Sequence, residues 1–458
     1  MSFTSFTFLF IVLPIFIISS LFLSIKINNI LLFIASLIFY SWGDPQHILF
    51  LIFLIVYNYF VLYYMDKKSD YRRKSLFIQG ICVNIFLLFY FKYYGFILNT
   101  IGDIFNFKMQ FEPIGSPIGI SFLTFSILSV LFDFYKHDLP KCPSFLEYAL
   151  YVAFFPKILM GPIERFAPFV KQIHHRKTSF SKASLGIERF IIGLSKKVLL
   201  ADSLSILYSL VIKNETLSFF TVWIAVIAFT LQIYFDFSGY SDMAIGLAQI
   251  ASFDLMENFN YPYIATSVSD FWRRWHISLS QWFRDYIYIP LGGNRVQPSR
   301  HVLNILAVWL TTGIWHGANW TYLIWGLYYG ILLLIEKYMF SKLNLPVKLK
   351  QISTFFFVMI GWVFFFSPSL SQAFHYLGAM FGTCGFALNQ SLWLIQNYGF
   401  VLLIAGLSIG PIPLRIYRKF HNDQQRHWIC LIVLFLLLFL NIATLLNSTY
   451  QSFLYAAF

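Results

Sequence analysis

Charged residues are scarce in this chain. Asp, Glu, Lys and Arg make up 12% of its 458 residues, while hydrophobic residues make up 58%. A soluble domain usually carries about 25% charged residues. The chain therefore lacks the polar surface that would let it face water on all sides, which excludes an ordinary water-soluble domain.

Cysteines and the common soluble-enzyme motifs are also missing or sparse. The four cysteines are scattered, without a Cys-x-x-Cys pair, so no disulfide framework or thiolate metal site is predicted. The sequence contains no Gly-x-Ser-x-Gly elbow, Walker loop, His-Glu-x-x-His or Gly-x-Gly-x-x-Gly. His174 and His175 are adjacent and point in different directions on a helix, so no metal is expected there.

Long continuous apolar runs are abundant, and about 20 apolar residues suffice for a helix to span the hydrocarbon core. Unpaired backbone groups are too costly in lipid for irregular spans. We therefore expect an all-α polytopic membrane protein, one domain over residues 1–458, with about twelve transmembrane helices. The expected spans are Phe6–Ile25, Ile30–Trp42, Ile48–Met65, Phe77–Leu98, Ile118–Tyr135, Leu185–Ile212, Phe219–Ile250, Val302–Gly317, Trp320–Tyr338, Gln351–Phe366, Phe400–Pro413 and Trp428–Leu446. Leu146–Met160 is interrupted by Pro156 and is read as re-entrant, because proline breaks the helical ladder.

The net charge of +13 is distributed as membrane topology requires. Basic residues cluster at 67–74, 171–182 and 415–426, whereas Ser369–Gly399 contains no Lys or Arg. Loops rich in Lys and Arg lie on the cytoplasmic side. The pattern predicts a multi-pass membrane protein with cytoplasmic basic loops, surrounded by lipid, and gives no reason to invoke nucleic acid.

The longest polar stretch, Ser252–Arg300, carries an aromatic stripe at helical spacing. Its members recur at intervals of three and four and are Trp272, Trp275, Leu279, Trp282 and Tyr286. Arg273, Ser280 and Arg284 fall on another face. A continuous helix with a tryptophan face and an arginine face is typical of the membrane interface, so we expect these aromatics to anchor the chain in lipid.

Polar side chains at membrane depth are costly and are candidates for function. His316 lies in an apolar segment beside Gly317, which leaves room for a backbone or a substrate to approach. Burial disfavours the imidazolium, so His316 should be neutral and able to accept a proton. A histidine hydrogen-bonded between helices is the structural alternative.

Other polar residues have stronger structural alternatives. His276 lies beside charged neighbours on the expected interfacial helix. Asp236 and Asp242 are expected to pair with Arg or Tyr groups, with a proton path or an ion site as the lesser alternative. On residues alone, these positions do not define an activity.

Several motifs occur in one order over nearly the whole chain and resemble the membrane-bound O-acyltransferases, in particular the bacterial branch that O-acetylates envelope polysaccharides. The motifs are Pro117-Ile-Gly-Ile-Ser-Phe, Phe155-Pro156 with Gly161-Pro162-Ile163, Tyr234–Gly246, Asp270-Phe-Trp-Arg-Arg-Trp-His276-Ile-Ser-Leu-Ser, Phe283–Arg295 and Trp315-His316-Gly317. The resemblance implies helices around a central funnel or tunnel, with His316 and His276 as catalytic residues.

The resemblance also implies acetyl-coenzyme A as the acyl donor, with no metal and no bound cofactor. His316 would act as base toward an acceptor hydroxyl, and the acetyl group would pass outward directly or through a periplasmic partner O-acetyltransferase. Arg273, Arg274 and Arg284 would attract the donor's phosphates, with lipid-headgroup anchoring as the alternative. The remaining candidates for donor or substrate binding are Asp285, Trp315, Asn319, Asp236 and Tyr240.

The acceptor is open on sequence grounds. A chain rich in Phe, Ile, Lys and Asn suggests an AT-rich genome, which favours peptidoglycan over alginate or another exopolysaccharide. D-alanyl transfer toward teichoic acid is a further alternative. A glycan or lipid transporter is the alternative outside enzymes, and it predicts inverted repeats that the sequence does not display.

Overall fold

The computed structural model describes residues 2–106, 111, 115–139, 141–213, 217–340, 345–421, 427–447 and 453. Within these ranges every regular element is a helix, which confirms the expected all-α fold. Eight of the described helices are long and apolar enough to cross a membrane. The protein is therefore a multi-pass membrane protein.

The expected twelve spans exceed these eight for identifiable reasons. Phe8–Phe22 and Ile120–Tyr135 are apolar but shorter than a full span. The expected spans Leu185–Ile212 and Val302–Gly317 fall on helices that carry charged or amide side chains, such as Lys197 and Asn304. These four stretches of the chain lie at the margin of what length and composition can assign to a membrane.

The described residues form two compact units that interleave along the chain. One contains the residues up to 190 together with 241–256, and the other contains 191–240 and the residues from 257 onward. Helices α8 and α10 contribute residues to both units. The expectation of one domain over residues 1–458 stays a prediction.

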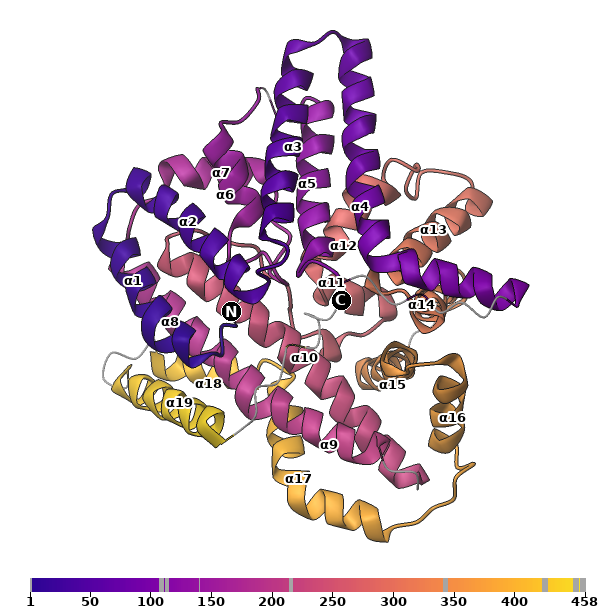
Figure 1. The fold of residues 1–458 in the computed structure, drawn as a ribbon. Helices are drawn as coiled ribbons and strands as arrows, with labels where there is room; N and C mark the ends of the chain where they lie inside the picture. The colour runs from indigo at the N-terminus through magenta and orange to yellow at the C-terminus, as the bar shows by residue number, and fades with distance from the viewer. Residues whose placement is uncertain are drawn as a thin grey trace. The chain divides into compact units, whose positions relative to one another are not determined.

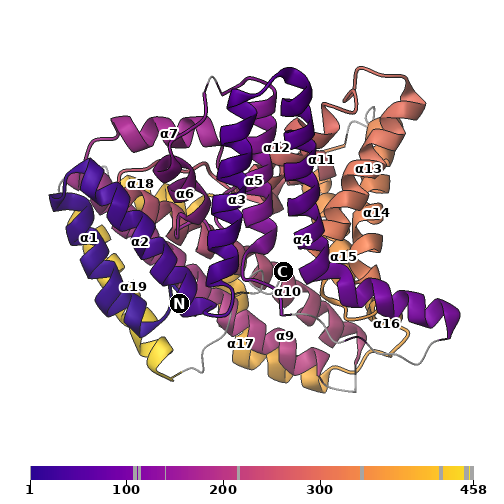
Figure 2. The same ribbon diagram turned by 45° about the horizontal axis from the view of Figure 1, so that its top comes forward.

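The first unit is built mainly from the N-terminal helices. They are α1 (Leu13–Phe22) with a π-helical turn before it (Phe8–Val12), α2 (Ile25–Gly43), α3 (Ile48–Lys67), α4 (Asp70–Phe105), α5 (Ile120–Tyr135), α6 (Phe145–Ala153), α7 (Phe166–His175) and the start of α8 (Phe180–Ser195). Helices α3, α4 and α5 pack side by side (Figures 1 and 2). A buried amide pair joins α3 to α4, because Asn58 and Asn84 each donate to the other's Oδ1, at 3.2 and 2.7 Å. Interhelical amide bonds of this kind stabilise helix pairs in membranes.

Helix α6 begins and ends where its sequence dictates. Ser144 and Glu147 form a capping box at its start, and the helix stops at Ala153, before Pro156. The Phe155 N–H that the break releases donates to Ser36 Oγ at 3.0 Å. The interruption expected at Pro156 is confirmed.

The second unit holds both histidine motifs. Its helices are α9 (Asp202–Ile212) with a π-helical segment before it (Lys196–Ala201), α10 (Phe219–Ile250), α11 (Val268–Arg274), α12 (Ile277–Phe283), α13 (Pro298–His316), α14 (Trp320–Ile335), α15 (Val347–Phe366), α16 (Leu370–Met380), α17 (Asn389–Ser408), α18 (Ile412–His421) and α19 (His427–Asn447). A 3₁₀ turn (Pro262–Ile264) precedes α11, and π-helical turns Arg284–Tyr288 and Glu336–Phe340 extend α12 and α14. Helices α13, α14 and α15 lie next to one another (Figure 2).

The expectation of one continuous interfacial helix through Trp272 and Tyr286 is wrong in two respects. The helix breaks between α11 and α12, where His276 takes a left-handed conformation with φ 43°. All five residues of the aromatic stripe are buried inside the protein, and Trp275 is 1% exposed. They pack against protein instead of anchoring in lipid, because α13, α14 and α15 supply aromatic partners such as Trp309 and Trp362.

Candidate active site

His316 is the last residue of α13, and close packing of α13 on α14 fixes its place. A Cβ at Gly313 would lie 2.5 Å from the carbonyl oxygen of Tyr322, and one at Gly326 would lie 2.4 Å from that of Trp309. Only glycine allows backbones to approach this closely. The room that the sequence predicted at Gly317 is used by a side chain of the neighbouring helix, because a Cβ at Gly317 would lie 2.3 Å from Cε2 of the Tyr322 ring.

Aromatic rings from three helices enclose the His316 side chain, which is 2% exposed. Its ring centroid lies 4.9 Å from that of Trp315, 4.8 Å from that of Trp325 and 5.3 Å from that of Phe365. The rings of Trp325 and Phe365 stand nearly perpendicular to the imidazole, at 82° and 78°. We call His316 and the three rings around it, Trp315, Trp325 and Phe365, the His316 enclosure.

His276 occupies the break between α11 and α12. Asn258, on the irregular segment before α11, holds this break with its backbone carbonyl, which accepts from the Ile277 N–H at 3.0 Å. Two residues further along the same segment, the Asn260 N–H donates to the Arg274 carbonyl at 2.9 Å. These two backbone hydrogen bonds join the segment before α11 to the residues on either side of His276 and so fix its position.

The tautomer of His276 follows from the side chain of Asn258. Asn258 Oδ1 accepts from the Ser278 N–H at 3.2 Å and from Ser278 Oγ at 2.9 Å. Because a backbone N–H can only donate, the atom that faces it must be the amide oxygen. The same oxygen lies 3.1 Å from His276 Nδ1, so Nδ1 carries the proton and Nε2 keeps its lone pair.

Burial keeps His276 neutral. Its side chain is 1% exposed, and Phe237 lies edge-on to the imidazole, with ring centroids 4.7 Å apart. Desolvation lowers the pKa of His276 to about 3, since an apolar setting disfavours the charged ring. His276 is therefore a neutral hydrogen-bond acceptor at Nε2 over the whole physiological pH range.

Both predicted histidines lie next to the same indole ring, that of Trp315. The Trp315 ring centroid lies 4.9 Å from that of His316 and 6.3 Å from that of His276. Trp315 is itself 5% exposed. Of the predicted site residues, the structure thus brings together His276, His316 and Trp315, and adds Asn258, which the sequence analysis missed.

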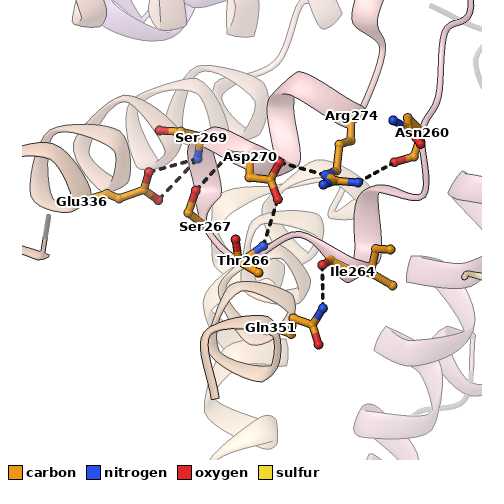
Figure 3. Close-up of polar contacts among 9 residues, drawn as sticks. All are labelled: Asn260, Ile264, Thr266, Ser267, Ser269, Asp270, Arg274, Glu336 and Gln351. Atoms are coloured by element: carbon orange, nitrogen blue, oxygen red, sulfur yellow. Dashed lines mark hydrogen bonds and ion pairs between the residues drawn. The ribbon is translucent and has the colours of Figure 1, made fainter. Parts of the chain in front are cut away.

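Arg274, a candidate for donor binding, is engaged in the fold (Figure 3). Its Nε donates to Asp270 Oδ1 at 2.8 Å, and its Nη1 donates to the Asn260 carbonyl at 3.4 Å. Asp270 also accepts from the Thr266 N–H at 3.1 Å. Glu336 accepts from two N–H groups in the first turn of α11. This network holds the segment that leads into His276.

Arg273, Arg284 and Asp285 lie on exposed or half-exposed surface. Arg273 is exposed on α11. The Arg284 side chain is 58% exposed and pairs with Asp285 at 2.8 Å. Exposed pairs of this kind contribute little to stability, so these arginines keep the freedom to bind an anion.

The remaining candidates have partners in the fold. Asn319 caps α14 by accepting from the Thr321 N–H at 3.1 Å, and it donates to the Pro368 carbonyl at 2.9 Å. Asp236 pairs with Lys197 at 2.7 Å. Through these contacts, Asn319 and Asp236 connect parts of the fold.

The expected pairing of the intramembrane acids holds in outline. Asp242 accepts from the guanidinium of Arg189 at 2.9 and 3.0 Å, as expected of an arginine partner. Asp236 pairs with a lysine, Lys197, a type of partner that the sequence analysis did not name. The Tyr240 ring packs against Phe453, with centroids 5.2 Å apart.

Comparison with known proteins agrees with the motif order. The sequence model of the family described as "MBOAT, membrane-bound O-acyltransferase family" matches residues 34–371. The chain is 41% identical over 440 residues to the probable alginate O-acetylase AlgI of Pseudomonas aeruginosa, covering 92% of this chain and 83% of that protein. It is 36% identical over 392 residues to the peptidoglycan O-acetyltransferase of Helicobacter pylori, covering 78% and 74%.

A third relative is more distant. The teichoic acid D-alanyltransferase of Bacillus subtilis is 31% identical over 281 residues, covering 55% of this chain and 68% of that protein. The family match runs from within α2 to the start of α16 and includes both histidine motifs. The chain is a membrane O-acyltransferase and belongs to the membrane-bound O-acyltransferase family.

Proposed function

We propose that this enzyme moves an acetyl group from cytoplasmic acetyl-coenzyme A to a hydroxyl of an envelope glycan. Peptidoglycan is the acceptor that we propose to test first. The observation that carries the proposal is the pair of buried histidines, His276 and His316, packed against the single indole of Trp315. A thioester is already activated. The protein therefore needs to supply a general base, to orient the two substrates and to exclude water from the site.

His316 is the proposed base toward the acceptor hydroxyl, a role that typically contributes 10²–10⁴-fold. His276 is the proposed orienting acceptor. Its Nδ1–H is committed to Asn258, so Nε2 accepts a hydrogen bond from the substrate. The exclusion of water by the surrounding rings prevents hydrolysis of the thioester.

Arg273 and Arg284 are the proposed contacts for the donor's phosphates. Both are exposed, and arginine suits phosphate recognition. Arg274 is not part of this proposal, because Asp270 and Asn260 already engage it. The distribution of Lys and Arg supports a bacterial inner-membrane location with the acyl donor on the cytoplasmic side. In this proposal, a periplasmic partner O-acetyltransferase receives the acetyl group at the other end of a funnel.

Alginate is the second candidate acceptor. It is favoured by the higher identity and coverage of the alginate O-acetylase relative, 41% over 92% of the chain. D-alanyl transfer toward teichoic acid has weaker support, since that relative matches 55% of the chain.

Transfer of radiolabelled acetyl from acetyl-coenzyme A by purified protein tests the proposal, with His316→Gln compared against wild type. His301→Gln is a matched control, because His301 lies on the same helix, is 3% exposed and bonds the hydroxyls of Tyr288 and Tyr338. We expect a loss of about 10²-fold or more in His316→Gln and retained turnover in His301→Gln. Equal transfer by His316→Gln and wild type would make His316 structural.

Mass spectrometry of muropeptides and of secreted polysaccharide, with and without the gene, identifies the acceptor. Loss of acetyl esters from muropeptides supports peptidoglycan. Unchanged muropeptides with loss of acetyl from an exopolysaccharide refute it and support the alginate-type reading.

A further inference from the structure

The Trp325 indole on α14 carries a buried N–H whose partner the protein does not supply. The side chain is 1% exposed, and among the described residues Nε1 has no hydrogen-bond acceptor. Buried indole N–H groups usually find one. Trp223 shows the ordinary arrangement, since its Nε1 donates to the Met380 carbonyl at 3.1 Å.

The position of Trp325 gives this N–H a use. Its ring centroid lies 4.8 Å from that of His316 and 5.4 Å from that of Phe365. A polar donor without a protein acceptor thus stands in the wall of the His316 enclosure. Buried donors left unpaired at such sites call for a functional explanation.

We propose that the Trp325 N–H donates to the carbonyl oxygen of the acyl thioester as that oxygen becomes an oxyanion. The inference rests on the proposed function, because it supplies an electrophilic partner for the base His316. Donors aimed at developing charge in a water-excluded site are worth far more than donors in water.

The step balances as an ordinary acyl transfer. The acceptor oxygen attacks the thioester carbon while its proton passes to His316, and the carbonyl π electrons move to the oxygen that Trp325 bonds. The tetrahedral intermediate collapses, the C–S bond breaks, and the leaving sulfur takes the proton from the imidazolium. The products are an ester and a thiol, without any oxidant or reductant.

A second use of the N–H competes with this one. Trp325 meets Trp272 at 83° and Tyr329 at 74°, with centroids 5.6 and 5.4 Å apart. An N–H pointing at an aromatic face gains a weak bond. That contact would stabilise the fold and leave turnover unaffected, so stability and turnover separate the two roles.

The test replaces the indole at 325 with its benzothiophene isostere, 3-benzothienylalanine, which keeps the bicyclic shape and removes only the N–H. Trp325→Phe is the genetically simple companion. We expect turnover in acetyl transfer to fall by about 10²-fold with the KM for acetyl-coenzyme A unchanged. The thermal midpoint should not fall, since no protein acceptor loses its donor.

Two matched positions control for general effects of losing an indole N–H. The same isostere at Trp362, which is 0% exposed and also lacks an acceptor among the described residues, should leave turnover unchanged, because its ring packs on Trp275 with centroids 4.9 Å apart. The isostere at Trp223 should lower the thermal midpoint and keep turnover, because the Met380 carbonyl loses its donor.

Wild-type turnover in the Trp325 isostere overturns the inference, as does an equal loss at Trp362. A lower thermal midpoint with wild-type turnover at 325 assigns the N–H to the aromatic faces and also overturns the inference. If unmodified protein transfers no acetyl from acetyl-coenzyme A, the proposed function itself fails, and that outcome is distinct from an active enzyme with an equally active isostere.

Discussion

Replacing Asn258 with Leu should disable the enzyme through His276. The substitution keeps side-chain size and removes the oxygen that accepts from His276 Nδ1, Ser278 N and Ser278 Oγ. The Ser278 hydroxyl can rotate to another acceptor, but His276 Nδ1–H and the Ser278 backbone N–H cannot. An unpaired buried donor costs about 1–3 kcal/mol, so Asn258→Leu should lower the free energy of unfolding by about 2–6 kcal/mol.

The effect on turnover has a separate cause. Without an acceptor at Nδ1, the imidazole can rotate and can place its proton on Nε2, the nitrogen that should accept from the substrate. A misplaced catalytic group can reduce the rate by about 10²-fold. Acetyl transfer measured beside thermal unfolding in detergent, in Asn258→Leu, His276→Gln and the double variant, isolates this contribution. If Asn258 acts through His276, the double variant should be no slower than His276→Gln alone.

Asn258→Asp keeps the acceptor oxygen and should restore the fold. Its carboxylate favours the imidazolium and so raises the pKa of His276. Turnover should therefore be lost on the acid side and recovered as the pH rises, which a purely structural role of Asn258 would not produce. A folded Asn258→Leu protein with wild-type turnover, or fully additive losses in the double variant, would refute the reasoning.

Three further predictions concern residues around the site. Because burial lowers the pKa of His276 to about 3 and the unfolded chain titrates near 6.5, the unfolded state takes up a proton first. The thermal midpoint should fall as the pH drops below about 6.5, and His276→Gln should flatten that slope. Arg274→Gln should lower the free energy of unfolding by about 0.5–1.5 kcal/mol, because Asp270 loses one of its two donors at a partly exposed site, and should leave the KM for the donor unchanged. An increased KM would show that Arg274 binds the donor after all. Gly326→Ala places a Cβ 2.4 Å from the Trp309 carbonyl. It should separate α13 from α14 at a cost of about 1–3 kcal/mol, with a loss of transfer activity. Wild-type stability and activity would contradict the tight packing.

Much of the fold could be predicted from composition and from the positions of proline and glycine. Apolar runs with few charges mark helices whatever their tertiary partners, which is why spans such as Ile48–Met65 match α3 (Ile48–Lys67) closely. Pro156 marks the end of α6 because it removes a backbone donor. Gly317, beside His316, correctly indicated a close approach, since the Tyr322 ring fills the space that a Cβ there would need.

The bend at His276 could not be predicted in this way. The stripe from Trp272 to Tyr286 keeps a helical period across the break, and periodicity reports faces but not interruptions that tertiary contacts impose. Asn258 lies in an irregular segment far from the histidine in sequence, so its role appears only when the chain is folded. Burial of the tryptophans was missed for a related reason: an aromatic stripe can face lipid or other aromatic rings.

The left-handed backbone at His276 has a consequence for how the enzyme matures. This conformation is unfavourable for a residue other than glycine, by roughly 1–2 kcal/mol, and contacts from Asn258 and Ile277 hold it in place. A newly inserted chain in which these contacts have not formed has every reason to continue as one helix through this stretch. Such a chain possesses both histidines without their mutual geometry. Catalytic competence therefore arrives only with the last tertiary contacts, and a partly folded molecule in the membrane cannot yet transfer an acyl group.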